Sequence, residues 1–439
     1  MSSRDYFKGK RIAIIGLGPN GEMVEDVKYL IKTGALVSVY DMKSEARVKS
    51  HLIFLRSLGL ANYVCGSIPS DDLLDMDIIV LSHEYTRDAT FLKPANEKGV
   101  IVEYPETLFL KRAPPVTIVG IMGDCGKTTV ISMLIPLLES VSTIRDEQGL
   151  FKIDPESSDG IIANLKKIKN GDLVVMKISP TIMIEMTRIR MSPHVAVFTT
   201  VPGPGSYEVQ PFEILSFQTY NNFIVASDEV IDDARKFKDL PSVKMLRTRS
   251  TLLPTEWILR VNGAHDRDNA ALALQTARLF KIEDDDAEHI LMSWKPLRGR
   301  LEFIKKVRNV EFYNDGESTN ALATEIAITS LVNEKNIVLI FGGADTFCDY
   351  SDLYSILPTS VHTIVLVPGS GTIRERVKLD KIENMNIISV PTIEEAVRLA
   401  MDNAKKGDRV LFSPAFQSIG IDGSTKQRSE RFVKAVRGL

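Results

Sequence analysis

The chain has 439 residues, of which 44% are hydrophobic and 25% are charged, and its formal net charge is −3. This composition predicts a globular protein with room for about two to four domains, and the small net charge gives no general electrostatic reason to bind nucleic acid or an anionic membrane. No apolar run approaches the roughly 20 residues that span a bilayer, and the N-terminus lacks the apolar core of a signal peptide, so we expect a cytoplasmic protein.

Short β-branched segments alternate with helical patterns along almost the whole chain, which favours parallel sheets built from strand–helix–strand units. In the first region the predicted strands and helix cover residues 11–16, 35–41 and 77–82, and residues 20–33. The segment KRAPP (111–115) is basic and contains two adjacent prolines, as a linker does. We therefore predict a Rossmann-like first domain over residues 1–112.

The second and third regions continue the alternation. In the second, the predicted strands cover residues 172–179, 194–200 and 223–227, and the last helix includes residues 269–280. WKPLRGR (294–300) has the character of a second hinge. Beyond it we predict strands in NIVLIFGG, TIVLVPG, NIISV and RVLFSPA, and a closing amphipathic helix in KQRSERFVKAVRGL. The simplest partition adds a central phosphate-loop domain over residues 113–296 and a Rossmann-like C-terminal domain over residues 297–439.

The first chemical motif is GLGPNG (16–21), a glycine-rich turn directly after a predicted strand and before a predicted helix. Glycine allows a tight turn and the close approach of a pyrophosphate, whose charge then meets the helix N-terminus. Asp41 ends the next predicted strand, where a carboxylate could accept a hydrogen bond from a sugar hydroxyl. The predicted ligand contacts are Gly16, Gly18, Asn20, Gly21 and Asp41; a purely structural tight turn is the alternative.

The second motif is GDCGKTT (123–129), again between an apolar strand pattern and a helical one. It nearly matches the phosphate-binding loop of nucleotide-binding proteins, with Ile121 in place of the first glycine. Backbone N–H groups around Gly123 and Gly126 would cradle phosphate, Lys127 would reach the terminal phosphates, and the hydroxyl of Thr128 would ligate Mg²⁺. The loop therefore predicts ATP and Mg²⁺; the alternative is a glycine-rich turn with an exposed lysine.

Five segments in this order make the chain resemble the Mur ligases, which build the peptide of cell-wall precursors. They are the phosphate loop, GAHDRDNAALA (263–273), FYNDGESTNALATEIA (312–327), and LIFGGADTFCDYSDL together with LFSPAFQSIGIDGSTKQRSERF. The third region is most similar to the D-glutamate-adding branch, the MurD type. The resemblance covers essentially the whole chain.

The resemblance implies an ATP-dependent joining of a carboxylate to an amine through an acyl phosphate. The first domain would hold the UDP end of UDP-N-acetylmuramoyl-L-alanine, the central domain ATP and Mg²⁺, and the third domain the incoming D-glutamate. From the small net charge and the lack of a long apolar run we expect no nucleic acid or membrane partner, and we expect a monomer.

The residues that match the family's motifs divide into two groups. The resemblance implies nucleotide binding for Lys127, Thr128, Thr129, Asn269, Arg300 and Asp315, and proximity to the carboxylates of the amino acid for Thr319, Ser413 and Ser418. Structural alternatives are that Asp315 caps a helix and that Ser413 satisfies a backbone group at a strand end.

Several positions depart from the family's pattern. Lys177 stands where a strand normally ends in a metal-binding glutamate, and an ammonium there should repel a divalent cation. No histidine follows the strand at 194–200, and the first carboxylate after it is Glu208. The segment 211–222 has no lysine that could be carbamylated, and Glu317 replaces a lysine.

Three hypotheses follow from these matches and departures. In the first, the chain is an active ligase in which Lys127 and Lys177 are catalytic and Lys177 replaces one Mg²⁺ in neutralising the acyl phosphate. In the second, it is a degraded homologue that binds a nucleotide or a partner protein without turnover. A nicotinamide-dependent oxidoreductase using GLGPNG is a third, but it leaves the phosphate loop without a purpose.

Overall fold

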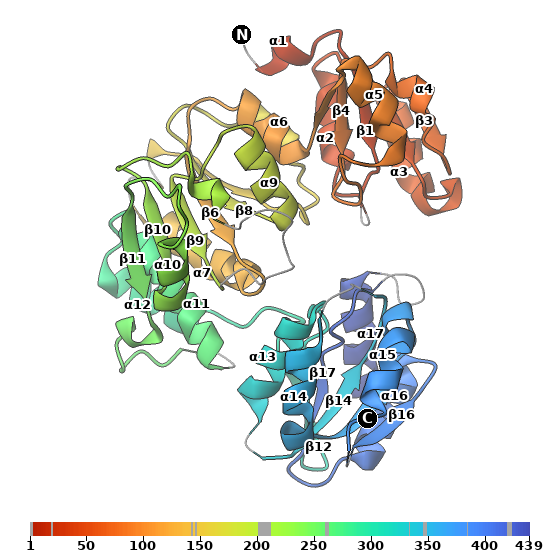
Figure 1. Cartoon of the computed structure of the whole chain (residues 1–439), viewed down its shortest axis with the longest axis vertical. Coiled ribbons are helices and arrows are strands. Elements are labelled where there is room, and N and C mark those ends of the chain that lie inside the picture. The colour runs from red at the N-terminus through yellow and green to blue at the C-terminus, as the bar shows by residue number, and fades with distance from the viewer. Residues whose placement is uncertain are drawn as a thin grey trace. The chain divides into compact units, whose positions relative to one another are not determined.

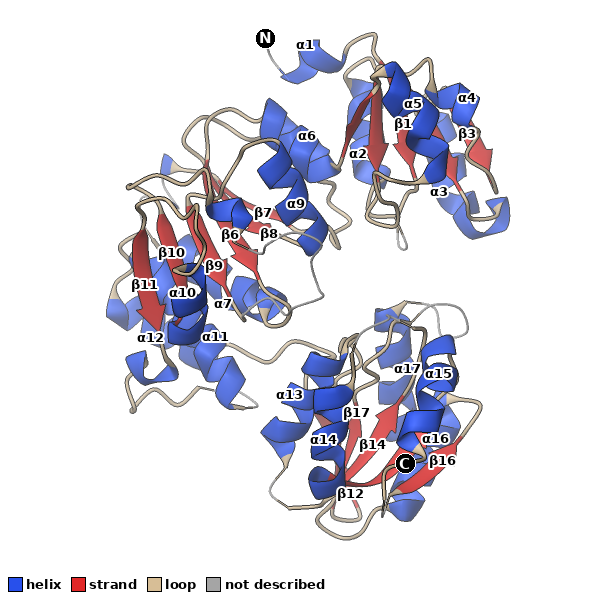
Figure 2. Cartoon of the chain, viewed as in Figure 1, coloured by secondary structure: helices blue, strands red, loops and turns tan. Residues whose placement is uncertain are grey.

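A computed structural model describes residues 3–18, 21–141, 144, 147–200, 212–259, 263–332, 334–345, 349–383, 385–418 and 424–439. These residues contain three separate sheets, each flanked by helices (Figures 1 and 2). This arrangement confirms the predicted α/β fold class. They form two compact units, one of Met1–Thr248 with Leu272–Ala287 and one of Arg249–Ala271 with Glu288–Leu439. The predicted boundaries after residues 112 and 296 stay predictions.

The first sheet has five parallel strands in the order β3-β2-β1-β4-β5. Its strands are β1 (Arg11–Ile15), β2 (Leu36–Asp41), β3 (Asn62–Cys65), β4 (Ile78–Leu81) and β5 (Ile101–Glu103), and its region contains α1 (Ser3–Phe7), α2 (Val24–Lys32), α3 (Glu45–Ser57), α4 (Ser70–Leu73), α5 (Lys93–Lys98) and α6 (Pro105–Arg112). All four residues of β4 are buried, as expected for a central parallel strand covered on both faces.

The second sheet has six parallel strands in the order β11-β10-β9-β6-β8-β7. Its strands are β6 (Thr117–Met122), β7 (Leu150–Ile153), β8 (Leu173–Lys177), β9 (Val195–Phe198), β10 (Phe223–Ser227) and β11 (Lys244–Thr248), and the helices of its region are α7 (Lys127–Ser140), α9 (Pro180–Arg188), α10 (Asp228–Ala234), α11 (Ala264–Arg278) and α12 (Asp284–Ser293), with 3-10 turns that include η2 (Ile162–Lys166). Since β6 lies between β8 and β9, the carboxyl ends of these three strands meet at one edge.

The third sheet is mixed and has the order β12-β13-β17-β14-β15-β16. Its strands are β12 (Glu302–Val307), β13 (Val310–Asn314), β14 (Ile337–Phe341), β15 (Val361–Leu366), β16 (Asn386–Ser389) and β17 (Arg409–Phe412), with helices α13 (Ala321–Leu331), α14 (Ser351–Ser360), α15 (Ser370–Leu379), α16 (Ile393–Asn403) and α17 (Thr425–Arg437). Two apolar clusters make its core.

The sequence pattern favours parallel sheets, and one edge of this third sheet departs from it. There, β12 and β13 form an antiparallel hairpin that the pattern did not predict. The hairpin turns through Arg308 and Asn309, whose φ angles are +49° and +67°. Two positive φ angles in succession are the signature of a type I′ turn, which matches the twist of the paired strands.

The first two sheets share one continuous apolar cluster, which includes Phe109 of α6, Ile162 of η2 and Met183 of α9. The buried carboxylate of Asp26 on α2 accepts hydrogen bonds from the N–H groups of Ile161 at 3.1 Å and Ala163 at 2.8 Å. The prediction of a linker at 111–115 is wrong for its first two residues. Lys111 and Arg112 are the last turn of α6, and α6 packs on η2 and α9.

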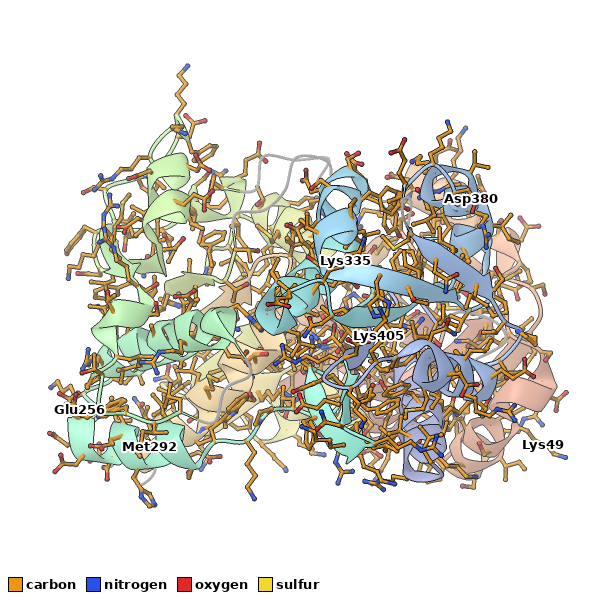
Figure 3. All side chains as sticks on the ribbon, turned by 90° about the horizontal axis from the view of Figure 1, so that it is seen from below. Lys49, Glu256, Met292, Lys335, Asp380 and Lys405 are labelled. Carbon is orange, nitrogen blue, oxygen red and sulfur yellow. The ribbon has the colours of Figure 1, made fainter. Side chains whose placement is uncertain are left out.

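Charged side chains such as those of Lys49, Glu256 and Asp380 are exposed to solvent (Figure 3). Among the helices that the structure describes, none combines the length and the apolar character that crossing a membrane requires.

Candidate active site

The phosphate loop connects β6 to α7 and is braced by the end of β9. The hydroxyl of Thr200 accepts the N–H of Asp124 at 2.9 Å, and the hydroxyl of Thr199 hydrogen-bonds to the carbonyl of Cys125. Gly123 has a φ of +123°, and a Cβ there would lie 2.4 Å from Oγ1 of Thr199 and 2.9 Å from the backbone nitrogen of Thr200. The sequence therefore needs glycine at this position to form the loop at all.

Lys127 begins α7 and is half-buried, with its ammonium folded over the loop. The Nζ atom donates to the carbonyl of Gly123 and, at 3.3 Å, to that of Asp124. Burial, followed by the nearby charge of Lys177, lowers the pKa of Lys127. Gly126 caps the helix with a φ of +83°, Thr128 is half-buried and Thr129 is buried in the first turn. The structure thus places the predicted loop residues together at the N-terminus of a long helix, where an anion is stabilised.

Lys177 is the last residue of β8, and its register partner Ile121 belongs to β6, the strand that leads into the phosphate loop. Only 7% of Lys177 is exposed. Its ammonium lies 2.7 Å from Oε2 of Glu156 and 3.7 Å from Oδ1 of Asp154, in the segment that follows β7. Sequence reasoning missed both carboxylates, because β7 is a short strand whose place beside β8 has no local signal.

Electrostatics within this cluster are nearly balanced. Burial raises the pKa of Asp154, but the charges of Lys177 and Lys152 outweigh it, and the pKa lies below its ordinary value. Lys152 pairs with the same carboxylate at 3.0 Å. Because Asp154 is ionised, the charge of Lys177 has a permanent partner inside the protein.

The donor set around the loop fits one Mg²⁺ bound jointly with nucleotide phosphates, through the hydroxyl of Thr128. Across the described ranges, no group of three or more histidine, cysteine, aspartate or glutamate side chains is placed to hold a metal ion. Lys177 stands at the strand end where a carboxylate ligand would be needed. The segment after the strand at 194–200, in which the sequence has no histidine and Glu208 is the first carboxylate, falls in residues 201–211, which lie outside the described residues.

The glycine turn of the first sheet has the predicted setting, since β1 ends at Ile15 and α2 begins at Val24. Gly16 has a φ of +76°, and a Cβ there would lie 2.5 Å from Oγ of Ser82. Gly18 and Gly21 also have positive φ angles, of +84° and +82°. Asn20 lies outside the described residues.

Asp41 is completely buried and supports this turn through backbone contacts. Its Oδ2 accepts the N–H of Leu17 at 3.1 Å, and its Oδ1 accepts the N–H of Lys43 at 2.9 Å. Both carboxylate oxygens are thus engaged in holding the turn in shape. A direct contact between Asp41 and a sugar hydroxyl stays a prediction.

His83, which sequence reasoning also missed, follows β4 at the same edge of the first sheet as the glycine turn. Its Nε2 lies 2.8 Å from Oε1 of Glu106, a completely buried residue at the start of α6. The ring of His83 stacks on that of Tyr104, with centroids 5.8 Å apart. Although burial lowers the pKa of His83, the charge of Glu106 and the hydrogen bond to it raise the pKa overall.

In the second unit, Asp315 and Ser413 lie in one buried network at the ends of β13 and β17. Oδ2 of Asp315 accepts the hydroxyl of Ser413 at 2.7 Å and that of Ser318 at 2.5 Å, and Oδ1 accepts the N–H of Leu301 at 3.0 Å. Burial raises the pKa of Asp315 to about 6 against the effect of these hydrogen bonds. Both residues therefore have structural contacts, but of another kind than the predicted helix cap and strand-end backbone bond: Ser413 donates to a carboxylate, and Asp315 accepts from two hydroxyls and the N–H of Leu301.

The remaining predicted contacts also belong to the second unit. Asn269 is buried on α11, whereas Arg300, Thr319 and Ser418 are half-buried in loops. Thr319 directly precedes Asn320, whose side chain caps α13 by accepting the N–H of Ala323 at 2.8 Å. The structure therefore places the loop lysines in one unit and these residues in the other.

Comparisons with known proteins bear on both units. Residues 299–416 match the Mur ligase family, in its glutamate ligase domain. A relative from Caldanaerobacter subterraneus subsp. tengcongensis, named UDP-N-acetylmuramoylalanine–D-glutamate ligase, is 27% identical over 98% of this chain and 99% of its own. A protein of the same name from Streptococcus pyogenes serotype M49 is 28% identical over 97% of this chain and 96% of its own.

Solved structures share the fold over nearly the full length. UDP-N-acetylmuramate–alanine ligase MurC from Thermotoga maritima has a TM-score of 0.60 at 16% identity, covering 98% of this chain and 99% of that one. A murein peptide ligase from Psychrobacter arcticus has a TM-score of 0.58 at 13% identity, with coverage of 98% and 99%. The chain is therefore similar to Mur ligases over nearly its whole length, and its residues 299–416 match the glutamate ligase domain of that family.

Proposed function

We propose that the chain is an ATP-dependent ligase that joins an amino acid to the carboxylate of a UDP-linked muramoyl precursor in peptidoglycan synthesis. The similarity to Mur ligases over nearly the whole chain and the intact phosphate loop support this proposal. The names of the relatives support the finer assignment, in which D-glutamate is added to UDP-N-acetylmuramoyl-L-alanine.

In this reaction the precursor carboxylate attacks the γ-phosphorus of ATP, so that an O–P bond forms and the bond to ADP breaks. The amine nitrogen of the amino acid then attacks the acyl carbon, phosphate leaves with the C–O electron pair, and the amine loses a proton. Both steps bring anions together, so the protein must mainly position the reactants and neutralise charge.

We propose the following roles for the residues of the site. Backbone N–H groups around Gly123 and Gly126 hold the polyphosphate with Lys127 and Thr129, and Thr128 holds Mg²⁺, which supplies further charge neutralisation when bound. The glycine turn at 16–21 takes the UDP end. Asn269 and Arg300 serve the nucleotide, Thr319 and Ser418 the amino acid, and Asp41, Asp315 and Ser413 position the backbone around them.

One observation carries the proposal of an active enzyme. Lys177 is not an exposed surface lysine but a buried ammonium beside the phosphate loop, and it faces a buried carboxylate, that of Asp154, which also pairs with Lys152. A fixed positive charge in a partly desolvated site stabilises a developing phosphoryl anion more than the same charge in water does. Lys177 thus supports the hypothesis that a lysine replaces one metal ion.

A phosphate-release assay tests the proposal. With ATP, Mg²⁺ and UDP-N-acetylmuramoyl-L-alanine, release should require an amino acid, and a panel of amino acids should show D-glutamate as the preferred one. Release that does not depend on the amino acid, or silence with both Mg²⁺ and Mn²⁺, would remove the ligase assignment.

The second candidate is a homologue that binds nucleotide without turnover. It is favoured by the lack of a metal-binding side-chain cluster in the described part of the chain. Under this alternative, calorimetry shows ATP binding while the phosphate-release assay stays at background.

A further inference from the structure

Glu156 is an exposed carboxylate that one of the most buried cations of the chain holds in place. The side chain of Glu156 is 70% exposed, whereas that of its partner Lys177 is 8% exposed. Lys177 already has a buried counter-ion in Asp154. Glu156 is therefore a second negative partner on the solvent side of the pair, and a half-exposed ion pair of this kind is worth about 1 kcal/mol or less. Such a partner can be exchanged at low cost.

A second ammonium, that of Lys127, lies at the same edge of the second sheet. Lys177 ends β8 opposite Ile121 of β6, and β6 leads into the phosphate loop, after which Lys127 begins α7. The charge of Glu156 also acts on Lys127, in agreement with this arrangement. The two lysines and the exposed carboxylate therefore belong to one region at the carboxyl ends of adjacent parallel strands.

We propose that Lys177 and Lys127 form one subsite for a carboxylate or phosphoryl group, and that Glu156 occupies this subsite until the precursor's own carboxylate displaces it. This inference rests on the proposed function and deepens it. The ligand is the free carboxylate of the precursor, and then the acyl phosphate made from it, whose larger negative charge the two lysines help to balance.

The exchange is chemically even. A substrate carboxylate presents the same two oxygens as Glu156, so Lys177 keeps a charged hydrogen-bond acceptor throughout and no buried charge is left unpaired. The released Glu156 turns into water, where it is already mostly exposed. Until then it repels other anions, so that the subsite favours a ligand that the rest of the site also binds.

Binding measurements with two probes test the subsite. UDP-N-acetylmuramoyl-L-alanine carries the carboxylate, whereas UDP-N-acetylglucosamine shares the UDP and the sugar but lacks it. Replacing Glu156→Gln should tighten binding of the first probe by about 3- to 10-fold, the equivalent of one partly exposed ion pair. The same variant should bind the second probe as the wild type does.

Asp159→Asn is the matched control. Asp159 is an exposed carboxylate on the same loop, hydrogen-bonded to the hydroxyl of Ser157 at 2.9 Å. The control changes the loop's charge as much as Glu156→Gln does, so an equal gain in affinity would mean general electrostatic attraction and would overturn the proposal. Because the side chain of Glu156 is exposed, its variant stays folded.

The remaining outcomes separate this inference from the proposed function. Unchanged affinities in Glu156→Gln, beside normal phosphate release in the wild type, refute the subsite and leave the ligase. Carboxylate-selective effects in a protein that releases no phosphate refute the ligase and leave the subsite. If the wild type binds neither probe, the subsite proposal is wrong.

Discussion

At the scale of single residues, the position that matters most is Lys177. A buried ammonium is costly unless a carboxylate faces it, and here Asp154 does so from the neighbouring segment. The same pairing keeps Lys177 charged and gives it one geometry. Its effects on stability and on chemistry can therefore be separated by changing the two partners in turn.

Lys177→Met should lower the free energy of unfolding by about 3 kcal/mol, because it leaves the buried Asp154 with only the half-exposed Lys152. Lys177→Met combined with Asp154→Asn should recover most of this loss in denaturant titrations, since no buried charge is left unpaired. Turnover should stay at least about 100-fold below the wild type in both variants, as when one transition-state donor is removed. Recovery of turnover in the double variant would contradict a catalytic role for the ammonium.

Gly123→Ala should abolish ATP binding in calorimetry, because the new Cβ would meet Thr199 and the backbone of Thr200. Gly171→Ala is the matched control: its φ is +87°, but nothing lies within 4 Å of the added atom. The control should cost about 1 kcal/mol of stability from backbone strain and leave ATP binding intact. Equal ATP affinities in the two variants would mean that the loop does not bind phosphate as proposed.

At the scale of elements, helix α2 meets η2 through a single carboxylate. Burial raises the pKa of Asp26, and the charge of Glu106 adds to this rise, whereas the backbone hydrogen bonds from Ala163 and Ile161 lower the pKa. The result is a rise from about 3.8 to about 7. An unfolded aspartate loses its proton near pH 4, so folding takes up a proton between about pH 4 and 7. The stability contributed by protonated Asp26 is therefore present at low pH and is lost as pH rises through this window.

Asp26→Asn isolates this effect. The unfolding midpoint of the wild type relative to the variant should fall as pH rises from about 4 to 7 and then level off. Glu25→Gln, on the same helix, removes a surface carboxylate that pairs with Lys28 at 2.7 Å, and should leave the pH dependence of the wild type. A constant difference between the wild type and Asp26→Asn would show that Asp26 does not stay protonated on folding.

The β12–β13 hairpin supplies an element-scale test of local geometry. Arg308→Asn with Asn309→Gly places the residues that a type I′ turn prefers at φ angles of +49° and +67°. The double variant should gain about 0.5–1 kcal/mol of stability, seen as a higher thermal midpoint of the second unit. A lower midpoint would mean that the side chains of these two residues, and not the turn, stabilise the hairpin.

Elements were predictable where one local signal decided them. The β6–loop–α7 unit follows from apolar runs around GDCGKTT, and β10 was placed at its observed bounds from FIVAS alone. The segments β3, β7 and β11 were missed because they are short and half-buried or exposed over much of their length. The Lys177–Asp154 pair depends on β7 lying beside β8, and a single sequence carries no information on which strands are neighbours.

At the scale of the whole molecule, three sheets make two compact units. The third sheet has its own apolar clusters on its two faces. The first sheet does not stand alone in this way, because the core residues of α6, such as Phe109, belong to a cluster shared with the second sheet. The three predicted α/β regions therefore correspond to three sheets, and the first two of these sheets share a core.

Fragments test this difference. Residues 297–439 alone should unfold cooperatively in a thermal melt, because the buried residues of its two apolar clusters all come from Leu301 onward. Residues 1–112 alone should melt at a lower temperature and bind a hydrophobic dye, since they expose the apolar side of α6. A first fragment as stable as the whole chain would contradict the shared core.

The lysine at the end of β8 is covalently part of the chain, so every molecule carries one positive charge at this position. No chelator can extract it and no calcium ion can replace it. An enzyme built this way would depend on free magnesium only through the ion that travels with the nucleotide, and would keep the other half of its charge compensation when the metal runs scarce.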